Sequence, residues 1–192
     1  IQQTNLPSID PSRRVLGVIR PTVECIGDLT QSRHIGLLAT TGTIKSESYL
    51  LEIQKLFPDI SVAGEACPMW VPLVENNEYH SKGADYFVQK HIQQLLDKDN
   101  QIDTIILGCT HYPLLIEKIK EFTPSHIRIV AQGEYVAQSL QDYFKRHPEM
   151  DNRCTKEGTC RFLTTESETK FEESASIFLQ QEDIHVERII LE

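Results

Sequence analysis

The sequence has no apolar run long enough to cross a membrane, and no signal peptide is visible in it. It is also short of positive charge. Its 19 lysines and arginines stand against 28 aspartates and glutamates, which gives a formal net charge of −9 with the histidines neutral. That balance argues against the phosphates of a nucleic acid as the main partner. We therefore expect no membrane and no nucleic acid among its partners.

Cysteines are few, and their spacing does not suggest a disulfide framework. There are five of them, an odd number at irregular intervals: Cys25, Cys67, Cys109, Cys154 and Cys160. A reducing compartment suits such a set, so we expect a cytoplasmic protein. The interval between Cys154 and Cys160 matches no standard zinc spacing, and there is no second cysteine pair, so we expect no metal site.

The bulk composition is ordinary for a folded globular protein. The 192 residues are 40% hydrophobic and 24% charged, which suffices for one substantial domain or for a domain with part of another. The chain starts at Ile1 instead of a methionine. We expect either that its N-terminus was processed or that further sequence precedes it.

Short apolar runs rich in valine and isoleucine alternate with amphipathic segments along most of the chain. This order predicts an α/β fold, a parallel sheet with helices on both faces. Two prolines break the apolar segment 67–75, which we expect to form a loop and short turns. We expect strands at 15–19, 35–39, 60–63, 104–107 and 127–131, and helices at 21–32, 44–56, 83–97, 113–119 and 134–144.

A polar stretch at 147–158 separates the last part of the chain from the rest. After it we expect a strand at 161–164, a helix at 168–179 and a strand at 186–191. This piece has too little apolar surface to form a core of its own, so we expect it to pack against a partner lobe.

The most informative stretch is 104–113, where a buried strand ends at Gly108 and a helix opens at Pro113. Cys109 and His111 follow the carboxyl end of this strand, where open α/β sheets bind ligands. A helix N-terminus lowers the pKa of a nearby thiol, and His111 is close enough to be a proton partner. Taken singly, such a cysteine is more often a small buried hydrophobe, and such a histidine a surface residue.

A second candidate site is the segment 40–43, Thr-Thr-Gly-Thr, which closes a strand and opens a helix. Hydroxyl and N–H groups at a helix N-terminus can bind an anion. Capping of the helix by Thr41 or Thr43 explains the same residues without any ligand.

The six residues 108–113, Gly-Cys-Thr-His-Tyr-Pro, resemble a motif of the glutamate racemases in the aspartate/glutamate racemase superfamily. In that family the motif carries the second of two catalytic cysteines. The resemblance implies inversion at Cα of an amino acid, without pyridoxal phosphate or another cofactor. Cys109 is then one of two thiol bases on opposite faces of Cα, His111 assists it, and Thr110 hydrogen-bonds the substrate. A thiol is apt because its pKa lies not far above neutral and can be tuned.

The segment 67–75, Cys-Pro-Met-Trp-Val-Pro-Leu-Val-Glu, also resembles the family. The family's glutamate at its end influences proton transfer, which makes Glu75 a catalytic candidate. A carboxylate near a histidine orients the ring and supports its charged form. Glu78 is a weaker candidate for the same role, and a solvated glutamate is the plain alternative. We interpret Cys67 as structural.

The segment 40–43 looks like the family's Ala-Thr-x-x-Thr segment, which implies that Thr40 and Thr43 hold charged groups of the substrate. The segment 130–134 differs from many family members, which have an acidic residue and a serine there. We assign it no catalytic role.

The resemblance covers essentially the whole chain and implies two pseudo-symmetric α/β lobes with the active site between them. We expect 1–14 to be the end of the first lobe or a linker, 15–131 to be the second lobe, and 132–192 to return and complete the first. The family's Ala-Cys-Asn-Thr-Ala segment, which carries the first catalytic cysteine, is not found in this sequence. We therefore expect the beginning of the first lobe to be missing.

The activity that the resemblance implies is that of a glutamate racemase, which supplies D-glutamate for peptidoglycan. Glutamate is then the small-molecule substrate, and we also expect a homodimer. An aspartate racemase is the near alternative, because the cysteine motif serves the whole superfamily. An alternative of another class is a catalytically incomplete fragment or a protein-binding module.

Overall fold

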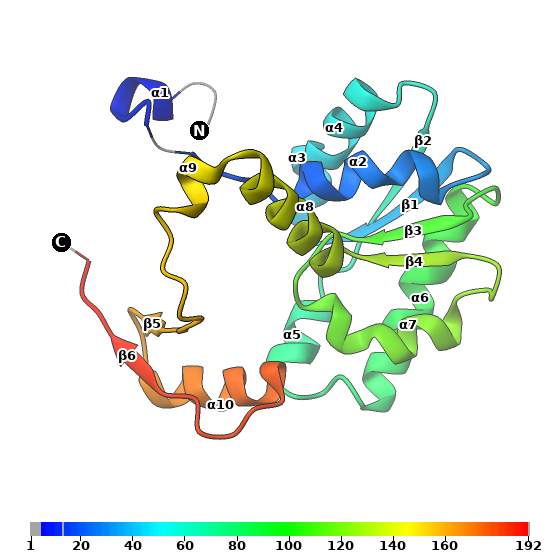
Figure 1. Ribbon diagram of the computed structural model, residues 1–192. Helices are drawn as coiled ribbons and strands as arrows, with labels where there is room; N and C mark the ends of the chain where they lie inside the picture. The colour runs from blue at the N-terminus through cyan, green and yellow to red at the C-terminus, as the bar shows by residue number, and fades with distance from the viewer. Residues whose placement is uncertain (1–4, 13, 192) are drawn as a thin grey trace. The chain divides into compact units, whose positions relative to one another are not determined.

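The computed structural model describes residues 5–12 and 14–191 (Figure 1). They form two compact units, and the first, Ile1–Tyr143, is built on a four-stranded sheet. All strand pairs are parallel, which confirms the predicted α/β fold. In the order β2-β1-β3-β4, the strands are β2 (Ser61–Ala66), β1 (His34–Ala39), β3 (Thr104–Leu107) and β4 (Arg128–Ala131).

The two central strands, β1 and β3, are buried along almost their whole length. This is the pattern of parallel strands that are covered on both faces. Leu38 of β1 pairs with Leu107 of β3, and Leu107 pairs with Ala131 of β4. Because the strands are parallel and in this register, their carboxyl ends lie together at one edge of the sheet.

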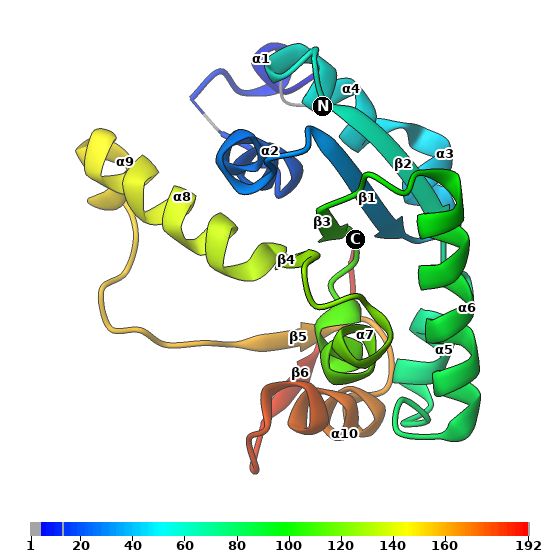
Figure 2. The same cartoon turned by 90° about the vertical axis from the view of Figure 1, so that its right-hand side faces the viewer.

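Helices cover both faces of this sheet, as Figure 2 shows for α2 on one side and α6 on the other. α2 (Ile19–Leu29) packs with α4 (Ser48–Leu56), and both bury apolar side chains against β1. α6 (Lys82–Lys98) packs on β1 and β2. It comes so close at Gly36 that an added Cβ would lie 2.6 Å from the Leu95 side chain.

Shorter helices connect these elements, and the boundary between the two units falls within the last long one, α8. None of the helices in residues 5–12 and 14–191 combines the length and apolar character that crossing a membrane requires. The further helices up to this boundary are α1 (Leu6–Ile9), α3 (Thr41–Ser46), α5 (Trp70–Glu75), the 3₁₀ helix η1 (Tyr112–Leu115), α7 (Ile116–Phe122) and α8 (Gln132–Arg146).

The prediction of a strand at 15–19 is wrong. Val15, Leu16 and Val18 are 44%, 48% and 52% exposed, and the chain enters α2 at Ile19. A short apolar run becomes a strand only when it pairs with a neighbour, which local sequence does not specify.

Among the other differences from the prediction, two concern helices. The loop predicted at 67–75 ends in the helix α5, where Pro72 is the third residue. Proline is tolerated there because the first four N–H groups of a helix have no partner within it. The single helix predicted at 44–56 is divided into α3 and α4 at Glu47, whose φ of 52° is left-handed.

The second unit, Phe144–Glu192, contains the predicted strand, helix and strand. β5 and β6 pair in parallel. A small cluster of Ala175, Ile184 and Val186, with Phe162 packed against it, forms its buried core, and the packing against a partner lobe that we expected stays a prediction. Its elements are α9 (Pro148–Asp151), β5 (Phe162–Thr164), α10 (Glu168–Leu179) and β6 (Val186–Arg188).

Asp103 joins the start of β3 to the turn that precedes β1. Its carboxylate accepts hydrogen bonds of 2.7 Å from the Thr30 hydroxyl and from the N–H groups of Gln31 and Ser32. Burial alone would raise the pKa of Asp103, but these donors hold it at about 2. The ionised carboxylate therefore stabilises the amino-terminal end of the sheet.

We predict that Asp103→Asn lowers the free energy of unfolding by about 1–3 kcal/mol at pH 7, because one acceptor oxygen and the charge are lost. The folded-state pKa is depressed, so this advantage of the native protein is present above the usual value of 3.8 and is lost as the pH falls through about 2. Urea denaturation of both proteins, with melting temperatures measured down to pH 2, checks this.

A matched control is Asp59→Asn, which removes an ion pair to Arg33 at the surface. Exposed pairs contribute little, so we expect a smaller loss than for Asp103→Asn. Equal losses in the two variants would contradict the structural role of Asp103.

Candidate active site

The candidate site lies at the carboxyl edge of the parallel sheet. Thr40 follows β1 directly, and Gly108 and Cys109 follow β3. Gly108 lies so close to β1 that an added Cβ would be 3.0 Å from the Cβ of Ala39 and from a Leu37 methyl carbon. A side chain there would make tight contacts, so Ala39 and Leu37 or the Cys109 turn would have to shift by a few tenths of an ångström.

Cys109 is half-buried, and its sulfur faces backbone N–H groups of the turn that follows it. Burial raises the pKa of the Cys109 thiol, while the N–H groups of His111, Tyr112 and Thr110 act in the opposite direction. Burial is the larger effect. The lowered pKa that we predicted from a helix N-terminus is therefore wrong: the helix that follows is only the short η1, and it does not outweigh the desolvation.

His111 connects Cys109 to a carboxylate. His111 Nδ1 lies 3.8 Å from Cys109 Sγ, and Nε2 lies 3.1 Å from Glu75 Oε1. Glu75 is the last residue of α5 and its side chain is 59% exposed, whereas that of His111 is 24% exposed. The structure thus brings the three predicted catalytic residues into one row. Such a row can pass a proton to or from the sulfur, because a carboxylate stabilises a protonated imidazole.

The predicted substrate-binding threonines lie at the starts of two helices. Thr40 is the N-cap of α3: its Oγ1 accepts from the Thr43 N–H at 3.3 Å and lies 3.0 Å from Thr43 Oγ1. Helix capping is therefore performed by Thr40, not by Thr41 or Thr43. Thr110 is exposed in the turn after Cys109. The substrate contacts of Thr40, Thr43 and Thr110 remain predictions.

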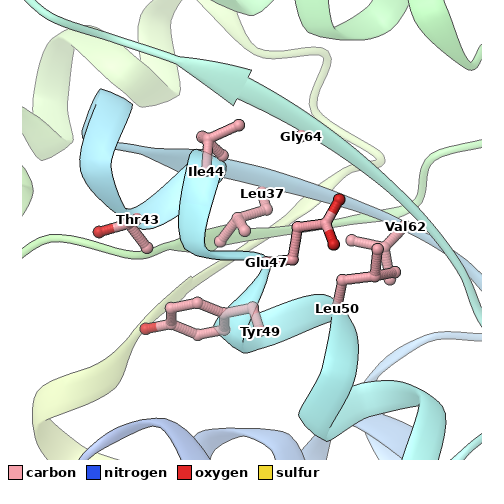
Figure 3. A pocket seen from close by; sticks show the side chains of 8 residues that line it. All are labelled: Leu37, Thr43, Ile44, Glu47, Tyr49, Leu50, Val62 and Gly64. Carbon is pink, nitrogen blue, oxygen red and sulfur yellow. The ribbon is translucent and has the colours of Figure 1, made fainter.

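Thr43 also borders a pocket of about 170 Å³ beside α3 and α4 (Figure 3). The view shows Ile44 and Leu37 along its wall, with Glu47 between them and Val62. The full lining is Leu37, Thr43, Ile44, Glu47, Tyr49, Leu50, Val62 and Gly64.

Gln132 and Tyr49 lie near the Cys109 turn, whereas the sequence analysis assigned the segment 130–134 no catalytic role and did not single out Tyr49. Gln132 Nε2 donates to the Leu107 carbonyl at 2.8 Å, next to the Cys109 turn, and its buried Oε1 has no hydrogen-bond partner among the described residues. Tyr49 is 2% exposed. Burial and the nearby Cys109 raise its pKa to about 12, which the Gln132 side chain partly opposes. The position of Gln132 directly after a predicted strand could have indicated it, because residues that follow parallel strands meet at one edge of the sheet.

The other cysteines differ from Cys109 in their surroundings. Cys67 is fully buried, and burial together with the Glu65 charge raises the pKa of its thiol. This environment agrees with a structural role. Cys154 and Cys160 are exposed in the second unit. Glu78, the weaker candidate beside Glu75, is exposed in the turn after α5.

We predict that iodoacetamide alkylates Cys109 faster than Cys67 in the folded protein, because Cys109 is half-exposed and contacts His111 while Cys67 is sealed in the core. Peptide mass spectrometry of timed samples measures both rates. In guanidinium the two rates should converge. Faster labelling of Cys67 than of Cys109 in the native protein would contradict this geometry.

Residues 13–140 match the family described as Asp/Glu/Hydantoin racemase, so the chain belongs to that family. Among curated relatives, it is 37% identical over 180 residues to a glutamate racemase of Streptococcus agalactiae, covering 92% of this chain and 66% of the relative. It is 39% identical over 183 residues to one of Enterococcus faecalis, covering 92% of this chain and 64% of the relative.

Solved structures of glutamate racemases are also similar to this chain. A glutamate racemase isoform from Bacillus anthracis matches with a TM-score of 0.84 at 32% identity, covering 97% of this chain and 69% of that one. A glutamate racemase from Francisella tularensis in complex with D-glutamate matches with a TM-score of 0.80 at 26% identity, covering 96% and 67%. The chain spans slightly less than two thirds of the length of the curated relatives named above.

Proposed function

We propose that this chain carries the Cys109 side of the active site of a glutamate racemase. The enzyme interconverts L- and D-glutamate without a cofactor. The single observation that supports this most is the row of Cys109, His111 and Glu75 at the end of β3 in a member of the Asp/Glu/Hydantoin racemase family. The similarity to glutamate racemases over more than nine tenths of the chain favours glutamate as the substrate.

The proposed reaction begins with the Cys109 thiolate. It removes the α-proton from one face of the substrate, so the Cα–H bond breaks, an S–H bond forms, and the electron pair remains on Cα and its carboxylate. A second acid then returns a proton to the opposite face. The α-proton is weakly acidic, so the site must stabilise the developing negative charge with fixed dipoles and exclude water.

His111 and Glu75 prepare Cys109 for this step. A thiol whose pKa is raised by burial is mostly protonated at neutral pH, but its thiolate is a stronger base when it forms. We propose that His111 takes the thiol proton and that Glu75 stabilises the ring that holds it, which the distances of 3.8 Å and 3.1 Å support. The hydroxyls of Thr40, Thr43 and Thr110 are proposed to hold the polar groups of the substrate.

The wider context of the activity is part of the same proposal. D-glutamate made in this way would supply peptidoglycan synthesis in the cytoplasm, with the enzyme acting as a homodimer. The lobe assignment also remains a proposal, with 15–131 as the second lobe and 132–192 as the return to the first. It is supported by a strand-helix-strand piece after residue 144 that has a very small core of its own.

We predict that the protein, assayed together with the complete first lobe that the proposed reaction requires, exchanges the α-proton of glutamate for deuterium in D₂O, and that Cys109→Ala abolishes this exchange from one face. Removal of the base leaves no group at that position to break the Cα–H bond. Proton NMR of L- and D-glutamate, together with chiral chromatography of the product, measures the exchange and the inversion.

Cys154→Ala is the matched control, because Cys154 is exposed in the second unit. It should behave like the unsubstituted protein. Full exchange in Cys109→Ala would overturn the assignment of the base. Absence of exchange with both enantiomers would overturn the racemase activity and leave the non-catalytic alternative. Exchange of aspartate but not glutamate would instead identify an aspartate racemase.

We further predict that Glu75→Gln slows exchange by about tenfold or more, because a neutral amide does not stabilise a proton on His111. Glu78→Gln is its control and should leave the rate close to that of the unsubstituted protein. A larger loss in Glu78→Gln than in Glu75→Gln would show that the carboxylate has been assigned to the wrong residue. The exchange assay in D₂O serves for both variants.

A further inference from the structure

A buried polar group on β2 and α6 takes no part in the proposed reaction. Glu65 and His91 are 9% and 6% exposed. His91 Nδ1 lies 2.7 Å from Glu65 Oε1, while Lys98 Nζ lies 2.7 Å from Glu65 Oε2 and 2.6 Å from the Gly64 carbonyl. Burial opposes ionisation of Glu65, but Lys98 and His91 outweigh it and lower its pKa. Both carboxylate oxygens are thus paired, and α6 is fixed to β2.

The His91 ring connects this cluster of Glu65, His91 and Lys98 to residues nearer the candidate active site. Its centroid lies 6.3 Å from that of Trp70, with the ring planes at 73°, an edge-on contact. Trp70 is fully buried, and its Nε1 donates to the Phe87 carbonyl of α6 at 3.3 Å. His91 and the α6 backbone therefore hold the indole in one orientation.

Trp70 in turn contacts Tyr112, which follows His111 in sequence. The two ring centroids are 4.7 Å apart with planes at 62°. Tyr112 is fully buried, and its hydroxyl donates to the Cys67 carbonyl at 3.3 Å. The Tyr112 N–H donates to the Cys109 carbonyl at 3.3 Å, and it also acts to lower the pKa of the Cys109 thiol. A shift of the Tyr112 ring would therefore move the turn that holds the thiol.

Trp70 is also the first residue of α5, whose last residue is Glu75. The Trp70 indole thus supports both partners of the contact between His111 and Glu75. It supports Glu75 through α5, and it supports His111 through the neighbouring Tyr112. A displacement of about 1 Å at reacting groups can cost a hundredfold in rate, so the packing around Trp70 bears on the chemistry.

We propose that His91 is a positioning residue for Cys109, and that it acts through the contact of its ring with Trp70 and not through its hydrogen bond to Glu65. This inference rests on the proposed role of Cys109. The alternative is ordinary core packing, in which any loss at His91 or Glu65 weakens the whole unit without a specific effect on the thiol.

Three variants separate these possibilities. His91→Leu removes both the ring and the donor to Glu65, and His91→Phe keeps a ring against Trp70 but removes the donor. Lys98→Met is the matched control, because it removes the other donor to Glu65 without touching Trp70. Circular dichroism of each variant checks that it is folded.

The readout is the rate of alkylation of Cys109 by iodoacetamide as a function of pH, followed on the Cys109 peptide by mass spectrometry. The titratable groups that the structure places around this thiol include His111, Glu75, Tyr49 and Tyr112. All of them are unchanged in these variants, so the profile reports their geometry. We expect His91→Leu to move the midpoint up by about one pH unit, which is about tenfold in rate at neutral pH.

His91→Phe and Lys98→Met should both keep a profile close to that of the unsubstituted protein. An unchanged profile in His91→Leu would overturn the proposal. A shift in His91→Phe as large as in His91→Leu would also overturn it, because the bond to Glu65 would then be the cause.

If His91→Leu fails to fold, Tyr112→Phe tests the same path, since it removes only the hydroxyl that fixes the ring to Cys67. We expect slower alkylation of Cys109 in Tyr112→Phe, and an unchanged rate would overturn the proposal. Alkylation needs no substrate turnover. A protein that exchanges no glutamate proton but shows these shifts would refute the proposed function while leaving the positioning role intact.

Discussion

The close approach of β3 to β1 at Gly108 is the constraint on which the candidate site depends. The Gly108 N–H donates to the Leu38 carbonyl at 2.8 Å, so the turn leaves the sheet only after the last strand residue is paired. Without a side chain at 108, the chain can turn directly above Ala39. Cys109 is thereby brought to the edge at which β1 ends in Thr40. A parallel sheet collects such residues at one edge because its strands all end there.

Burial and the surrounding N–H groups have opposite effects on the pKa of the Cys109 thiol. Removing the sulfur from water disfavours the thiolate, while three N–H groups of the turn favour it, and burial dominates. This compromise suits the role proposed for Cys109, that of a base which is strong when its thiolate forms and protonated between turnovers. His111 and Glu75 offer a path for that proton, and the exposed Glu75 carboxylate keeps the path in contact with solvent. Cys67 is sealed in the core, where burial and the Glu65 charge raise the pKa of its thiol more than its hydrogen-bond partners lower it, so it is expected to be inert.

The helix α5 connects the candidate site to the hydrophobic core. It begins at the buried Trp70 and ends at the exposed Glu75, so one short element is anchored on α6 and presents a carboxylate to His111. With six residues, α5 is too short to be stable by itself, because isolated helices of this length have marginal stability in water. The packing of Trp70 against His91 and Tyr112 is what keeps it in place.

The sequence by itself determined the parallel α/β order, the position of Cys109 at a strand end and the small strand-helix-strand after 158, because hydrophobic periodicity and turn residues are local signals. Only the tertiary structure decided that 15–19 is not a strand, that Pro72 lies within a helix, and that burial raises the pKa of Cys109. It also revealed Gln132 beside the Cys109 turn and placed Glu75 against His111. These outcomes depend on strand partners, packing and desolvation between residues far apart in the chain, and no local pattern records them.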